Sequence, residues 1–116
     1  IVNEDDTVDD GDIPHEVAAL LTIANSKFSR LWNRIPEPNF NGDTSTSAWA
    51  FYIAEELVYR RIHPDVIKRA LKYWCLIEGY AKGEREDWLD TVINGAYDSI
   101  NHRHKTKKVE AETLVD

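Results

Sequence analysis

The sequence predicts an all-α fold, a compact bundle of four to five short helices with disordered N- and C-terminal tails. Apolar residues recur at spacings of three and four along four segments, which is the period of an amphipathic helix. Prolines and glycines stand at the ends of these segments, and no segment alternates as a strand does. At 116 residues, the chain is long enough for one domain with a single modest core.

The first helix is expected to begin near Pro14, because proline is tolerated in a first helical turn. Glu16 there suits the positive end of the helix dipole. Pro36 and Pro38 end the helix, and a loop follows over 36–44. The apolar stripe of this helix consists of Val17, Leu20, Leu21, Ala24, Phe28, Leu31 and Ile35.

A second helix is expected from Ser45 or Ser47 to Arg61, and a third opens at His63-Pro64-Asp65 and closes at Gly79 or Gly83. The inward residues of the second helix are Ala50, Ile53, Ala54, Leu57 and Val58, and those of the third are Val66, Ile67, Ala70, Leu71, Trp74 and Ile77.

The fourth helix is expected over about 84–101, although Gly95 inside it costs about 1 kcal/mol relative to alanine. Its inward residues are Leu89, Val92, Ile93, Ala96, Tyr97 and Ile100.

The net charge of −7 is concentrated in one segment. Residues 1–12 hold six of the 21 acidic residues and no Lys or Arg, which is typical of a disordered acidic linker. The remaining 15 acidic residues nearly balance 14 basic ones, so any basic surface must be local. We expect an acidic linker over 1–12, a helix-bundle domain over 13–104 and a flexible charged tail over 105–116. Because the chain starts at Ile1 and contains no Met, we expect it to be a piece of a longer protein.

Several classes of function lack their sequence signals. No apolar run approaches the ~20 residues of a membrane span and no leader opens the chain, so we expect a cytoplasmic protein without a membrane partner. The single Cys75 excludes an internal disulfide framework. No catalytic triad pattern is present, and the pair His102-x-His104 lacks the further ligands of a zinc site. We therefore expect no active site and no protein-held metal in this domain.

The stretch NGDTSTSAWAFY, residues 41–52, brings hydroxyl groups and aromatic rings to the start of the second helix. One interpretation is helix capping, for which Ser45 or Ser47 suffices. The other is a nucleotide site, in which free N–H groups and spare hydroxyls hold a phosphate and Asp43 bonds a base or ribose. The chain has no GxxxxGK[ST] sequence, so this is not a P-loop.

The face of the second helix opposite its aliphatic stripe carries Trp49, Tyr52, Tyr59 and Arg60, together with Glu55 and Glu56. A helix that lies in the centre of the bundle would bury these rings. The two glutamates make full burial expensive, so we expect part of this face to be wet. Exposed rings beside arginines would then stack on the bases of single-stranded DNA.

Basic residues gather around the turn between the second and third helices. Between Lys27 and Lys72 there are eight basic and five acidic residues. They favour either an ordinary solvated face or a patch that follows phosphates. Lys82 and Arg85, near Trp88, present the same two alternatives. The basic patch residues are Arg60, Arg61, Lys68, Arg69 and Lys72, with Tyr73 at their border.

A family resemblance connects these features. Phe28-x-x-Leu31-Trp32, Gly42-Asp43-x-Ser45, the proline-started helix, Lys82 and Trp88-Leu89-x-x-Val92-Ile93-x-x-Ala96 together resemble the helix-bundle domain of archaeal plasmid primase-polymerases. The resemblance covers about 15–101, and Asp43-x-Ser45 is its most specific part. Two features differ: Ala48 replaces an acidic residue common in relatives, and a Lys-rich link is reduced to Lys82 and Arg85.

The resemblance implies a non-catalytic module that binds single-stranded DNA template and ATP or dNTP for a neighbouring primase-polymerase domain. Any Mg²⁺ would arrive with the nucleotide, and the chemistry would belong to that neighbouring domain. The implied nucleotide contacts are Asp43, Ser45, Thr46, Ser47, Lys82 and Arg85. The implied DNA contacts are Trp32, Trp49, Tyr52, Tyr59, Arg60, Arg61, Lys68, Arg69, Lys72 and Tyr73.

Two alternatives remain open at this stage. The same aromatic residues would serve as anchors in a protein-interaction module. A helix-turn-helix reader of double-stranded DNA would instead use the third helix, which offers few residues able to read bases.

Overall fold

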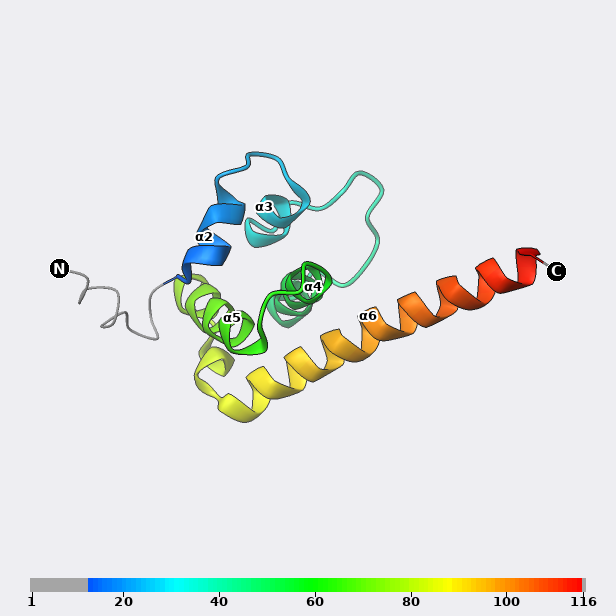
Figure 1. The fold of residues 1–116 in the computed structure, drawn as a ribbon. Helices are drawn as coiled ribbons and strands as arrows, with labels where there is room; N and C mark the ends of the chain where they lie inside the picture. Colours follow the sequence, from blue (N-terminus) through cyan, green and yellow to red (C-terminus); the bar gives the residue numbers. More distant parts are fainter. Residues whose placement is uncertain (1–12, 116) are drawn as a thin grey trace.

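The computed structural model describes residues 13–115, with side chains described over 13–102. Five α-helices and one short 3₁₀-helix follow one another along the chain, and the described part contains no strand (Figure 1). The predicted all-α bundle is confirmed. The elements are α2 (His15–Leu21), α3 (Lys27–Trp32), α4 (Thr46–Tyr59), α5 (Pro64–Glu78), η1 (Ala81–Glu84) and α6 (Glu86–Val115).

The prediction of one continuous first helix is wrong, because polar residues interrupt it after Leu21. The Thr22 hydroxyl donates to the carbonyl of Ala19, and Asn25 takes a left-handed conformation with φ of 63°. Ser26 then caps a new helix by accepting a hydrogen bond from the N–H of Ser29 at 3.1 Å. The apolar stripe therefore continues across two short helices, although Ala24 and Ile35 are exposed.

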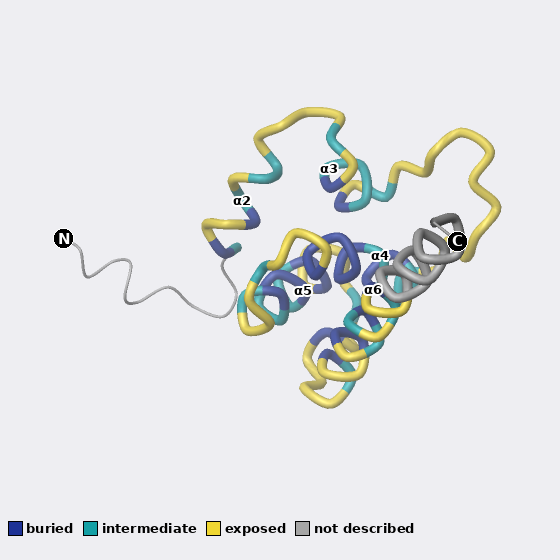
Figure 2. Tube along the Cα trace, turned by 45° about the vertical axis from the view of Figure 1, so that its right-hand side comes forward, coloured by how far each residue is buried: buried dark blue, intermediate teal, exposed yellow. Residues whose placement is uncertain are grey.

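Helix α4 lies at the centre of the bundle, between α3, α5 and α6 (Figures 1 and 2). Every residue from Ile53 to Val58 is buried, including both glutamates. Gly95 of α6 faces α4, and a Cβ atom placed there would lie 3.3 Å from Cε1 of Phe51. A methyl group at this position would require the edge of the Phe51 ring to shift by a few tenths of an ångström.

The ends of α5 are fixed by local chemistry. Its first residue is Pro64, and the N-cap His63 accepts the N–H of Asp65 through Nδ1 at 3.1 Å. Gly79 ends the helix with φ of 70°, a conformation that glycine adopts without steric cost. The chain then folds back through η1 onto α5. Ile77, predicted to point inward, is 53% exposed because it lies close to this end.

Helix α6 continues to Val115, well past the predicted end near Asn101. Its first half packs on α4 and α5, and its later turns extend away from the bundle (Figure 1). Of the charged segment expected over 105–116, residues 105–115 form the last turns of this helix. The side chains of this segment lie outside the described residues, as does the whole of the expected linker 1–12. None of the described helices is long and apolar enough to cross a membrane.

Candidate nucleic-acid interface

The Asp43–Ser45 turn caps α4. Ser45 is the N-cap, and its hydroxyl oxygen accepts the N–H of Ala48 at 3.3 Å. The Asp43 carboxylate accepts the N–H of Ser45 at 2.8 Å, while the Tyr52 hydroxyl donates to the Asp43 carbonyl at 2.9 Å. The backbone N–H and then the hydroxyl of Ser45 lower the pKa of Asp43, so this exposed side chain is an anion at neutral pH. Helix capping thus uses the Asp43 carboxylate and the Ser45 hydroxyl of the hydroxyl-rich stretch.

A guanidinium group completes the polar cluster at the start of α4. Arg34 donates to the Thr44 carbonyl at 3.2 Å and to the Thr46 hydroxyl at 3.3 Å, and it pairs with Glu78 at 3.3 Å. It thereby joins the loop after α3, the start of α4 and the end of α5. Sequence reasoning missed Arg34, because its left-handed backbone (φ 59°) and its partner 44 residues away leave no local pattern. Beside this cluster, the Ser45 and Ser47 hydroxyls lie 3.3 Å apart.

Both tryptophans proposed to stack on bases are buried. Trp49 is 3% exposed and packs between Phe40 and Tyr52, because α4 is the central helix. Trp32 is 7% exposed, with its ring stacked on Tyr73 at a centroid distance of 6.3 Å. Neither indole can meet a base without repacking the core.

The other predicted rings differ in their accessibility. Tyr52 and Tyr73 are half-buried, whereas Tyr59 at the end of α4 is 62% exposed. Tyr59 is therefore the predicted stacking residue with the most accessible ring.

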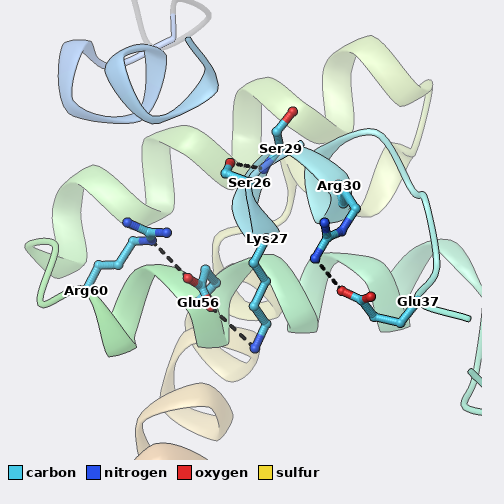
Figure 3. A network of polar contacts seen from close by, with 7 residues as sticks. All are labelled: Ser26, Lys27, Ser29, Arg30, Glu37, Glu56 and Arg60. Atoms are coloured by element: carbon cyan, nitrogen blue, oxygen red, sulfur yellow. Dashed lines mark hydrogen bonds and ion pairs between the residues drawn. The ribbon is translucent and has the colours of Figure 1, made fainter. Parts of the chain in front are cut away.

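The expectation that part of this face is wet is confirmed at its end, where Tyr59 and Arg60 are exposed, whereas Glu55 and Glu56 themselves are buried. Glu56 is buried but pairs with Arg60 at 2.9 Å and with Lys27 of α3 at 3.7 Å (Figure 3). Glu55 accepts a hydrogen bond from the Ser99 hydroxyl of α6. Partners from three helices thus offset the cost of burying these carboxylates.

The lysines of α5 are paired with α6. Lys68 contacts Glu86 at 2.6 Å and Asp90 at 3.0 Å, and Lys72 contacts Glu86 at 3.3 Å. Hydrogen bonds from Lys68 and then Lys72 lower the pKa of Glu86, and hydrogen bonds to Glu86 and then Asp90 raise the pKa of Lys68. Sequence reasoning missed this pairing because the acids lie on a different helix. Arg69 is half-buried, and no carboxylate among the described residues pairs with it.

The short helix η1 carries the last predicted nucleotide contacts. Lys82 is exposed, while Arg85 pairs with Asp87 at 2.9 Å. Tyr80, just before η1, packs against Trp88 of α6 at a centroid distance of 5.6 Å.

A cavity of about 300 Å³ lies between the end of α5 and η1. Cys75 lies at its inner wall, and burial raises the pKa of its thiol to about 12. The cavity is mostly apolar and is lined by Lys72, Cys75, Leu76, Gly79, Tyr80, Ala81, Gly83 and Glu84.

The predicted contacts fall into several groups instead of one. Asp43, Ser45, Thr46 and Ser47 lie at the start of α4, whereas the Tyr59–Arg61 segment lies at its end. At 1.5 Å per residue, the 14 residues of α4 separate these groups by about 20 Å. The other cations lie along α5 and on η1.

Across residues 13–102, no three His, Cys, Asp or Glu side chains gather as a metal site. The sequence also holds the pair His102-x-His104, of which His104 lies outside the side chains described. No known protein family, no curated protein and no solved structure matches this chain.

Proposed function

We propose that this chain is a non-catalytic accessory domain of a DNA primase-polymerase. It binds single-stranded template DNA and an ATP or dNTP, and so supports primer initiation by a neighbouring polymerase domain in the cytoplasm. The observation that carries this proposal is the exposed Asp43-x-Ser45 turn at the start of α4. It is the most specific part of the resemblance to archaeal plasmid primases, and the Arg34 guanidinium lies next to it.

The chemistry of this turn suits a nucleotide. An ionised Asp43 accepts hydrogen bonds from a ribose hydroxyl or a base amino group. Phosphate oxygens are favoured near the N-terminus of α4, where the helix dipole is positive. Arg34 can exchange Glu78 for a phosphate, because both are anionic partners of a half-exposed guanidinium. Mg²⁺ would accompany the phosphates, with no ligand supplied by the domain.

In this proposal the domain contributes binding and no covalent step. Holding template and initiating nucleotide together converts a collision of separate molecules into an encounter within one complex, which lowers the entropic barrier. Nucleotidyl transfer and its metal ions belong to the polymerase domain.

The proposal is tested by NMR, with ¹⁵N-labelled protein titrated first with Mg²⁺-ATP and then with a single-stranded oligonucleotide. We expect amide shifts in 43–47 and at the Arg34 side chain. Asp43→Asn should weaken the ATP response, whereas the control Asp65→Asn, an exposed aspartate at the start of α5, should not. Unchanged spectra with millimolar ATP and with the oligonucleotide would refute the proposal.

A second candidate, a protein-interaction module, is favoured by one observation. Leu76 and Ile77 at the end of α5 are 65% and 53% exposed, and Leu76 borders the apolar cavity. Exposed apolar neighbours of this kind are typical of protein contacts. Sedimentation would then show self-association, or capture of a primase domain, that persists at high salt. The double-strand alternative is less favoured, because Lys68 and Lys72 are held by acidic residues of α6.

A further inference from the structure

The ion pairs at the end of α4 place the positive charges outermost. Glu56 is the buried partner, with its side chain 8% exposed. Its two partners are more exposed, Lys27 of α3 with 64% and Arg60 at the end of α4 with 34% of the side chain accessible, and Figure 3 shows them pairing with Glu56 from either side. A ligand approaching this surface meets the two cations and not the carboxylate.

The pairs between α5 and α6 show the opposite order. There the side chains of Lys68 and Lys72 are 29% and 33% exposed, whereas those of Glu86 and Asp90 are each 58% exposed. A polyanion approaching that face meets carboxylates first. The two faces therefore differ in the sign of their outer charge, although each contains lysine or arginine paired with acid.

Two further residues, the aromatic Tyr59 and the cationic Arg61, extend the surface around Lys27 and Arg60. Tyr59 precedes Arg60 and is 62% exposed, three residues from Glu56 and on the same side of the helix. Arg61 is exposed, and no described carboxylate pairs with it. Of the neighbouring acids along the chain, Glu55 is buried against Ser99, whereas Asp65 is exposed at the start of α5.

This combination suits single strands more than duplexes. A single strand offers unstacked bases to an exposed ring, and its phosphates follow nearby cations. Glu56 also holds Lys27 and Arg60 in place, so less side-chain freedom is lost when a strand binds. Here Glu56 is a positioning residue and makes no contact with the strand.

We infer that single-stranded nucleic acid crosses the surface formed by Lys27, Tyr59, Arg60 and Arg61, and does not follow the lysine face of α5. This inference rests on the proposed function and deepens it, because it separates the strand from the nucleotide turn at the opposite end of α4. Tyr59 stacks on a base, and the three cations contact the phosphates on either side of it.

The experiment measures fluorescence anisotropy of a labelled oligothymidylate over a series of salt concentrations, with circular dichroism to verify folding. Tyr59→Ala should weaken binding by roughly 5- to 150-fold, corresponding to one lost stacking contact, whereas Tyr59→Phe should retain most affinity. The double variant Lys27→Gln/Arg61→Asn should reduce the salt slope by about 0.7 for each lost phosphate contact. Asparagine is chosen because Arg61 has φ of 63°, which asparagine tolerates.

The matched control is Lys68→Gln/Lys72→Gln, which removes two cations from the other face and should leave affinity within about twofold. Loss of binding in this control, with Tyr59→Ala unaffected, would overturn the inference while leaving the proposed function intact. Equal affinity for a duplex of the same length would overturn it as well. If the unaltered protein binds no oligonucleotide, both the inference and single-strand binding as its function are refuted.

Discussion

Adding one methyl group at Gly83 should destabilise the fold, because η1 packs directly on α5 there. A Cβ atom at this position would lie 2.2 Å from Cβ of Cys75 and 2.9 Å from its sulfur. Both distances are shorter than real Cβ atoms show to any neighbour. Cβ of Cys75 is bonded directly to the α5 backbone and cannot move aside by itself. Gly83→Ala must therefore displace η1. Overpacking of this kind costs about 1–3 kcal/mol.

The cost is measured by urea unfolding and by thermal melting, where each kcal/mol lowers Tm by about 4–8 °C in a domain of this size. Gly95→Ala is the matched control, because its Cβ would meet only a ring edge at 3.3 Å and its helix propensity would improve. Cys75→Ala should not rescue Gly83→Ala, since the clashing Cβ remains. A Gly83→Ala protein as stable as wild type would refute the reasoning.

Two other predictions concern the acids. Replacing Lys27 and Arg60 by methionine leaves Glu56 buried without a cation, which should cost about 3 kcal/mol in urea unfolding. Glu56→Gln in that background should recover most of the loss; no recovery would contradict the pairing. Folding lowers the pKa of Asp43 below its ordinary value of 3.8. The ionised carboxylate therefore stabilises the fold at pH values above 3.8, and this stabilisation is lost as the pH falls through the folded-state pKa. Thermal melts should therefore show Asp43→Asn less stable than wild type at neutral pH, with the difference vanishing in acid; a constant difference would exclude the Asp43–Ser45 bond as its cause.

The local features of the fold could be predicted because their causes are local. Ser45 as a cap, Pro64 at the start of α5 and the end of α5 at Gly79 depend on a few neighbouring residues each. The breaks around Thr22 and Asn25 were missed because the apolar stripe continues across them, so periodicity alone does not reveal the interruption.

The candidate site was less predictable, since its properties depend on what lies across from each residue. On a helical wheel, Trp49 and Tyr59 belong to the same outer face. In the structure, Phe40 and Tyr52 cover Trp49, whereas Tyr59 at the end of the helix is left exposed.

The sequence by itself determined the helical class, the helix ends at caps, prolines and glycines, and the positions of most core residues, because hydrogen bonding and apolar periodicity act over one or two turns. Only the tertiary structure decided which charges are outermost. The Glu56 side chain is more buried than those of Lys27 and Arg60, whereas the Glu86 side chain is more exposed than that of Lys68. Both faces contain basic side chains paired with acidic ones. Burial, which depends on how the helices pack, gives them opposite outer charge.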